Sequence, residues 1–176
     1  MNEHDSQILA GLLDQYPNEN YEFTENIDEA DLILVNTCCI RESAENKILG
    51  YLGSLKKYKT ANPNVILVVC GCMAQESSAI ERIKKRAPHI DIVFGTFNLP
   101  KLQEYIKDYR AKQKFIYDIA ETPGLEKLRL PVHQDIQAFK GKVNIIYGCN
   151  NFCAYCIVPY VRGRERSRSI AHIIEE

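Results

Sequence analysis

The chain of 176 residues is 45% hydrophobic and 26% charged, a composition typical of a globular protein, which excludes a wholly disordered chain. Its formal net charge of −1 excludes a global field that would attract nucleic acid or a membrane surface, so any anion site must be local. The sequence contains neither an apolar run near the roughly 20 residues that span a bilayer nor the features of a signal peptide, and we therefore expect a cytoplasmic protein with no membrane partner.

Helical and strand patterns alternate along the first part of the chain. Helical spacing of apolar residues over 6–16 predicts an amphipathic helix, with Asp5 or Ser6 as its cap. The short apolar run within 31–38 predicts a fully buried strand. The two patterns then recur and predict, in chain order, a helix at 43–58, a strand at 65–72, a helix near 75–86, a strand at 92–94, a helix from about 98 to 109 and one more strand at 114–119.

Buried strands separated by amphipathic helices predict an α/β domain at residues 1–118, with a parallel sheet and helices on both faces. Proline and glycine among charged residues at 119–141 predict a linker. A second unit at 142–176 is expected to open with a strand at 142–147, to continue through a cysteine-rich loop and to begin a helix near Ser169. One strand and part of a helix cannot bury a core, so we expect this second domain to be truncated.

The first domain has two cysteines in matching positions. Cys38 and Cys72 each follow the carboxyl end of a predicted strand, and one strand–helix unit separates them. Loops at the carboxyl ends of parallel strands converge on one crevice, so we expect the two side chains to face a common point. The alternative is that both are small buried residues. Their neighbours Cys39 and Cys70 lack the matching position, and we assign both to that structural class.

Three more cysteines, Cys149, Cys153 and Cys156, lie within eight residues of the second unit. In a compartment that keeps thiols reduced, a chain with seven cysteines is expected to use them for metal binding or catalysis rather than for disulfides. A structural zinc site needs a fourth cysteine or histidine, and the one candidate nearby, His172, lies in a predicted helix. The trio therefore favours an iron–sulfur cluster with one open iron over zinc.

The spacing Cys149-x-x-x-Cys153-x-x-Cys156 is similar to the signature of radical S-adenosylmethionine enzymes, and the segment 148–168 around it resembles the methylthiotransferase branch of that superfamily. The likeness covers nearly the whole chain. Three further motifs resemble the amino-terminal domain of that branch, and the first of them is similar to the end of the Gly-Cys-Gln-Met-Asn motif of the tRNA enzymes that make 2-methylthio-N6-isopentenyladenosine. These motifs are MNEHDS at 1–6, NTCCIRESAENK at 36–47 and GCMAQE at 71–76.

The resemblance implies two [4Fe-4S] clusters and S-adenosyl-L-methionine as cofactors. By this likeness the three loop cysteines hold one cluster, whose open iron binds S-adenosylmethionine, and Tyr155 lies against the adenine. Cys38 and Cys72 match two of the three ligands of the second cluster, which delivers sulfur. The implied activity is the addition of a methylthio group to C2 of N6-isopentenyladenosine beside the anticodon. The implied partners are the tRNA substrate and an electron donor that the sequence does not identify, and we expect a monomer.

The chain departs from the resemblance at its start. The third ligand of the second cluster is expected two residues before the methionine that corresponds to Met1, after a strand that the sequence also lacks. We therefore interpret the chain as truncated at both ends, with an incomplete ligand set for the second cluster, and we do not expect it to be a competent enzyme alone.

Three alternatives stay open at this point. Within the same branch, one alternative acts on threonylcarbamoyl-adenosine in tRNA and another modifies a ribosomal-protein aspartate, although the residues at 1–6 and 36–42 favour the isopentenyladenosine type. From another class, the alternative is a zinc-stapled RNA-binding module. The alternating arginines at 162, 164, 166 and 168 suit RNA phosphates if the segment is extended, but a solvated loop is the more common explanation of such a charge run. The resemblance implies a third role for some of them, which is to order the cysteine loop or to meet the substrate.

Overall fold

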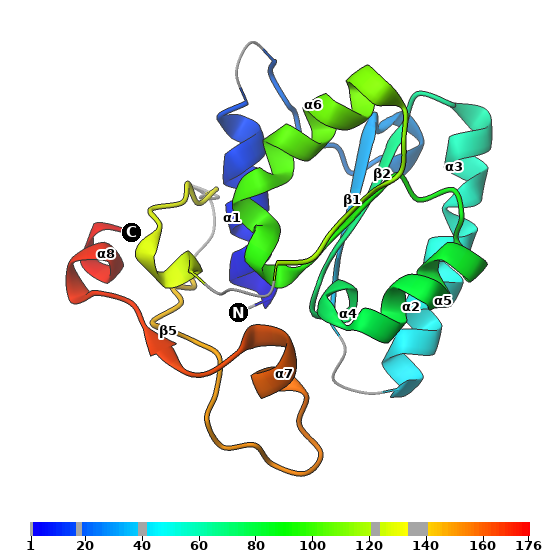
Figure 1. Ribbon diagram of the computed structural model, residues 1–176. Coiled ribbons are helices and arrows are strands. Elements are labelled where there is room, and N and C mark those ends of the chain that lie inside the picture. The colour runs from blue at the N-terminus through cyan, green and yellow to red at the C-terminus, as the bar shows by residue number, and fades with distance from the viewer. Residues whose placement is uncertain (1, 17–18, 39–41, 121–123, 134–140) are drawn as a thin grey trace.

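The structure, a computed structural model, describes residues 2–16, 19–38, 42–120, 124–133 and 141–176. Its centre is a sheet of four strands that pair in chain order and all run parallel. Figure 1 shows this sheet edge-on between two layers of helices. The prediction of an α/β fold with a parallel sheet is confirmed. The strands are β1 (Leu32–Thr37), β2 (Ile66–Gly71), β3 (Ile92–Phe94) and β4 (Ile116–Asp118).

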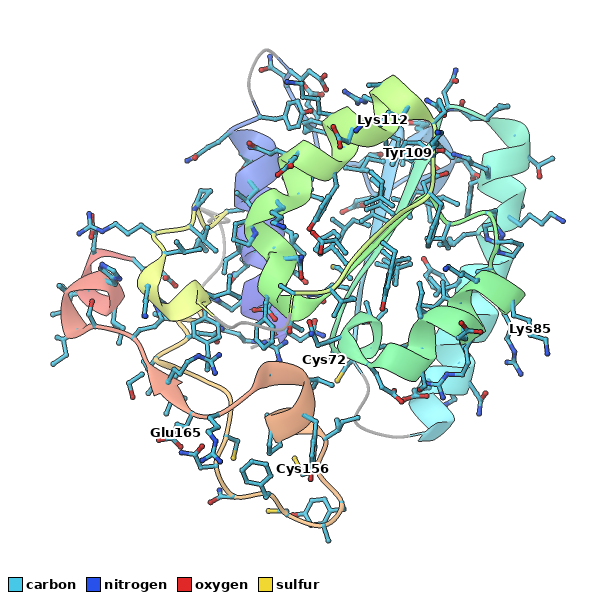
Figure 2. The ribbon with its side chains drawn as sticks, viewed as in Figure 1. Cys72, Lys85, Tyr109, Lys112, Cys156 and Glu165 are labelled. Carbon is cyan, nitrogen blue, oxygen red and sulfur yellow. The ribbon has the colours of Figure 1, made fainter. Side chains whose placement is uncertain are left out.

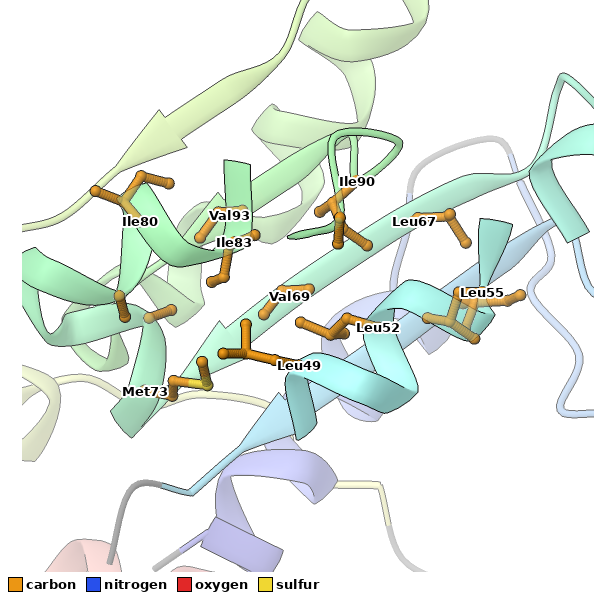
Figure 3. Close-up of a cluster of buried hydrophobic side chains, with 14 of the residues drawn as sticks. Leu49, Leu52, Leu55, Leu67, Val69, Met73, Ile80, Ile83, Ile90 and Val93 are labelled. Carbon is orange, nitrogen blue, oxygen red and sulfur yellow. The ribbon is translucent and has the colours of Figure 1, made fainter. Parts of the chain in front are cut away.

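Strand β2 is buried along its whole length because each of its faces packs on a different layer. Its residues Ile66, Val68 and Cys70 belong to the cluster that also holds the apolar stripe of the first helix. Leu67 and Val69 point to the opposite cluster, drawn in Figure 3. This double burial explains why the strand is an unbroken apolar run rather than an alternating one.

The helices cover both faces, as predicted. On one side lie α1 (Asn2–Asp14) and α6 (Leu102–Lys112), and on the other lie α2 (Glu42–Ser54), α3 (Lys56–Ala61) and α5 (Ser77–Arg86) (Figure 1). Three boundaries differ from the prediction. The helix expected at 43–58 divides into α2 and α3 at Leu55, the one near 75–86 is preceded by the short α4 (Cys72–Gln75), and the one from about 98 begins as a 3-10 turn, η2 (Thr96–Lys101). A shorter 3-10 turn, η1 (Ile27–Glu29), precedes β1.

The described part of the predicted linker packs along α1. The side chain of Leu125, in the 3-10 turn η3 (Leu125–Lys127), is buried in the same cluster as α1. The backbone amide of His133 donates to the carbonyl oxygen of Gln7 at 2.9 Å. The segment therefore follows the surface of the first unit, and the division of the chain at 119–141 stays a prediction.

The last unit contains a two-stranded antiparallel pair, β5 (Ile146–Tyr147) with β6 (Arg166–Ser167), and the helices α7 (Val158–Arg162) and α8 (Ile170–Glu175). The strand expected at 142–147 and the helix expected near Ser169 are both present, the strand in shorter form. Its partner β6 was not predicted. That this unit opens a radical S-adenosylmethionine barrel stays a prediction. No helix in the described residues is long and apolar enough to cross a membrane.

Candidate metal centre

Cys38 and Cys72 lie at the same edge of the sheet. Cys38 follows β1 directly, and Cys72 follows β2 directly as the first residue of α4. The last residues of the two strands, Thr37 and Gly71, are partners in the parallel register. The prediction that both cysteines follow neighbouring strands at the carboxyl edge of the sheet is therefore confirmed. Cys39 lies outside the described residues.

Gly71 makes the sharp turn that brings Cys72 back against the sheet. Its φ of 95° lies in the left-handed region, and a Cβ atom there would stand 2.3 Å from the carbonyl oxygen of Thr37. Only glycine fits both conditions. The hydroxyl of Thr37 donates to the carbonyl oxygen of Cys70 at 2.5 Å and holds the two strand ends together. The position of Cys72 is thus set by backbone geometry.

The thiol of Cys72 is 7% exposed and meets a charged residue from the other end of the chain. Arg162, the last residue of α7, donates from Nε to the Cys72 sulfur at 3.2 Å and from Nη2 to Oδ2 of Asp5 at 2.5 Å. Burial alone lowers the pKa of a guanidinium, but the Asp5 carboxylate and the Cys72 sulfur outweigh it, so the pKa of Arg162 lies above its ordinary value. The guanidinium is therefore a permanent positive charge beside this sulfur.

The other three cysteines lie on a loop whose two ends are joined by a hydrogen bond between Cys149 and Gly163, and we call this junction the neck. The amide of Cys149 donates to the carbonyl oxygen of Gly163 at 3.2 Å, so the loop returns to its starting point. Inside it, the amide of Cys156 donates to the carbonyl oxygen of Cys153 at 2.9 Å and forms a tight turn. Cys149 and Cys156 are half-buried and Cys153 is exposed. The loop therefore offers three free thiols, none of them sealed in a core.

Gly148 is the residue that allows the neck to close. Its φ is 75°, and a Cβ atom there would stand 2.2 Å from the carbonyl oxygen of Arg164. We expect Gly148→Ala to weaken the neck by about 1–3 kcal/mol, because alanine cannot adopt this conformation without strain. Hydrogen exchange at the Cys149 amide should be about tenfold faster or more. The matched control is Gly141→Ala, where a Cβ atom meets nothing within 4 Å. Equal exchange in the two variants would contradict the prediction.

Helix α7 docks the cysteine loop onto the first domain. Its Val161 is buried in the cluster shown in Figure 3, and the backbone oxygen of Val161 accepts a hydrogen bond at 2.8 Å from the hydroxyl of Thr96 in η2. Figure 2 shows Cys72 at the edge of the sheet, next to α7, and Cys156 on the loop beyond that helix. Cys72 and Cys156 therefore lie at the same end of the molecule.

The cysteine side chains are of the chemical type that a thiolate-bound metal centre needs, but the structure does not bring them close together. Soft thiolate ligands are those that iron–sulfur clusters and zinc prefer. Among the described residues, no three of His, Cys, Asp and Glu are grouped closely enough to hold a metal ion. Ligand roles for Cys38, Cys72, Cys149, Cys153 and Cys156 thus rest on residue type, spacing and a shared end of the fold. Tyr155, on the same loop, is 88% exposed.

Cys70 behaves as a structural cysteine. It is completely buried, and this burial, followed by the nearby charges of Asp5 and Cys72, raises the pKa of its thiol far above the ordinary value. A protonated thiol is a poor metal ligand, since the thiolate is the form that binds. The assignment of Cys70 to the core is confirmed.

Three of the four alternating arginines donate hydrogen bonds to other groups of the same chain. Arg162 is buried as described above, the Nη2 of Arg166 donates to the carbonyl oxygen of Arg162 at 3.1 Å, and Arg168 bonds the carbonyl oxygen of Asn144 at 2.8 Å and the carboxylate of Glu176 at 2.6 Å. Arg164 is exposed, with its guanidinium 5.9 Å from the centre of the Phe152 ring. These contacts hold the arginine segment against the rest of the protein. Sequence reasoning missed the roles of Asp5 and Arg162, because no local pattern links them.

Comparison with known proteins shows which family and which relatives the chain is similar to. Residues 1–95 match the model of a family described as "Uncharacterized protein family UPF0004". Over its whole length the chain is 46% identical to a protein of Acetivibrio thermocellus, 49% to one of Clostridium beijerinckii and 48% to one of Pelotomaculum thermopropionicum. Each of these relatives is named tRNA-2-methylthio-N(6)-dimethylallyladenosine synthase. The chain spans only 36%, 38% and 39% of their respective lengths.

Proposed function

The chain belongs to the Uncharacterized protein family UPF0004, and from this premise we propose that the protein is a tRNA methylthiotransferase. The proposed reaction adds a methylthio group to C2 of N6-isopentenyladenosine (also called N6-dimethylallyladenosine) next to the anticodon. Support comes from the names of relatives that are 46–49% identical over the whole chain. The proposed substrate is tRNA, and the proposed place of action is the cytoplasm, where thiols stay reduced.

The observation that carries the proposal is the closed loop with three free thiols, docked beside the sheet edge that bears Cys72. We propose that Cys149, Cys153 and Cys156 hold one [4Fe-4S] cluster. Cys38 and Cys72 would contribute two thiolates to a second. When bound, these groups and S-adenosyl-L-methionine supply the radical chemistry and the sulfur that the reaction needs.

The protein's own part is to bind and orient these groups. The neck between Cys149 and Gly163 fixes the base of the loop, and the turn between Cys153 and Cys156 brings their backbones together. Tyr155 is free to lie against an adenine ring, because its side chain is exposed. The domain division at 1–118, 119–141 and 142–176 belongs to the same proposal, with the last range as the start of a radical S-adenosylmethionine domain. A monomeric state is also proposed.

Reconstitution without oxygen tests the metal site. The chain is incubated with ferrous iron, sulfide and a thiol reductant, desalted, and analysed for iron, sulfide and visible absorbance. We expect a brown protein with iron and sulfide in similar amounts. A colourless protein that instead retains one equivalent of zinc would contradict the proposal and favour the zinc-stapled module.

The substrate is tested with the protein that the whole gene encodes, supplied with S-adenosylmethionine and a reductant. The candidate substrates are tRNA bearing isopentenyladenosine, tRNA bearing threonylcarbamoyl-adenosine, and the ribosomal protein. Mass spectrometry should find a methylthio group on the first substrate. Modification of either of the other two instead would show that the branch is right and the substrate wrong.

A further inference from the structure

The contact between Arg162, Asp5 and Cys72 joins three segments that are far apart in the sequence. Arg162 is 4% exposed and Asp5 is 1% exposed, although charged residues are rarely buried to this degree. Arg162 ends α7, Asp5 lies in α1, and Cys72 begins α4. The burial of these three side chains against one another does not follow from the helix that each belongs to. Their contact therefore exists because of how the cysteine loop meets the first domain.

The contact depends on the planar shape of the guanidinium group of Arg162. One edge of Arg162 donates through Nη2 to the carboxylate of Asp5, and its Nε donates to the sulfur of Cys72. A planar fork with fixed donors holds both partners in one arrangement, whereas the single ammonium of lysine cannot reproduce it. A buried ion pair adds little net stability, because desolvation offsets the attraction. Its contribution here is therefore position rather than stability.

The position of Arg162 in the chain links this contact to the loop. The next residue, Gly163, accepts the hydrogen bond from the amide of Cys149 that closes the neck. The residue before it, Val161, is anchored to Thr96 through its backbone oxygen. Fixing Arg162 therefore fixes the neck of the cysteine loop relative to the sulfur of Cys72.

We propose that Arg162 is the positioning residue that fixes the place of the Cys149–Cys156 loop relative to the sulfur of Cys72. The part of this inference that concerns bound clusters rests on the proposed function. In the metal-free chain, Arg162 shields the Cys72 thiol and holds the neck closed. If Cys72 binds iron, the N–H group of Arg162 would donate to the ligand sulfur and its positive charge would stabilise the reduced form, so the reduction potential would be higher with Arg162 than without it.

The first test uses the metal-free 176-residue chain. Its variants are Arg162→Gln, Arg162→Lys and, as a control with the same change of charge, Arg164→Gln at an exposed position. Alkylation of Cys72 by iodoacetamide is followed by peptide mass spectrometry, together with hydrogen exchange at the Cys149 amide. We expect both rates to rise about tenfold or more in Arg162→Gln, because removing the contact favours local opening. Arg164→Gln should stay within about twofold of the wild type, as surface changes usually do.

The variant Arg162→Lys distinguishes the effect of the guanidinium geometry from the effect of the positive charge. It keeps a partner for Asp5 but loses the fork, so the chain should stay folded while Cys72 reacts faster than in the wild type. If Arg162→Gln does not fold, the double variant Asp5→Asn with Arg162→Gln removes both charges and is measured in its place. Unchanged alkylation of Cys72 and unchanged exchange at Cys149 in the folded variants would overturn the inference.

The second test uses the reconstituted protein that the whole gene encodes and follows the cluster at Cys72, because the 176-residue chain carries only two of the three ligands implied for that cluster. The midpoint potential should be more negative in Arg162→Gln than in the wild type and unchanged in Arg164→Gln, a difference that a merely structural role would not produce. Equal potentials in all three would refute the part of the inference that concerns iron. If the wild type takes up no iron, the proposed function fails, while alkylation of the metal-free chain still decides the role of Arg162.

Discussion

Replacing Cys153 with alanine is expected to abolish retention of the iron–sulfur cluster by the loop. Two thiolates cannot hold a cluster that three are proposed to bind, so the loss of iron should exceed the roughly 10–100-fold cost of changes around a metal's ligands. Because Cys153 is exposed, its replacement should leave the free energy of unfolding within about 0.5 kcal/mol of the wild type. Iron and sulfide are measured after anaerobic reconstitution and desalting, and stability by urea unfolding of the metal-free chain.

Cys70→Ala is the matched control. Cys70 is completely buried and its thiol pKa is raised, so its sulfur is unsuited to binding iron. This variant should lose about 1 kcal/mol of stability through poorer packing and still take up iron at the loop. The two variants are therefore expected to show opposite results, one in metal content and the other in stability. Iron retained by Cys153→Ala but lost from Cys70→Ala would contradict the assignment of the cluster to the loop.

The fold was predictable because its main signal is the apolar pattern of buried parallel strands. β2 is apolar at every position that faces either layer, and such a run is typical of a strand covered on both sides. The helix boundaries were less predictable. Gly71 has a φ of 95°, which redirects the chain into α4 at Cys72, and the extended backbone of Glu76 separates this short helix from α5. The sequence shows a glycine there, but its conformation depends on the contact with β1.

The placement of Cys38 and Cys72 after neighbouring strands was predictable from topology alone, since parallel strands bring their following loops to one edge. The docking of α7 was not. Arg162 lies in a run of arginines that looks like a solvated or RNA-binding segment, and its partner Asp5 was expected to cap a helix. In the structure α1 begins at Asn2, so Asp5 lies inside the helix and is buried. A pair 157 residues apart leaves no local trace in the sequence.

Replacing Asp5 with asparagine is expected to release the cysteine loop from the first domain. The change leaves the guanidinium of Arg162 buried without its counter-charge, and breaking a buried pair from one side costs about 3–5 kcal/mol. Undocking α7 relieves this cost, because Arg162 then reaches water while the sheet stays intact. Hydrogen exchange should therefore become faster at the amides of Cys149 and Val161, with little change in the strands β1 and β2.

Asp14→Asn is the control on the same helix. Asp14 contacts His133 at 2.6 Å, but both side chains are more than a third exposed, and such surface pairs contribute about 0–1 kcal/mol. Both variants change an aspartate of α1 to asparagine. A difference in hydrogen exchange between them therefore results from the burial of Asp5. Adding Arg162→Gln to Asp5→Asn should restore part of the lost protection at Val161, because no uncompensated charge is then left in the interface. If the double variant is no better protected than Asp5→Asn alone, the uncompensated charge is not what drives the loop away, and the two residues act separately.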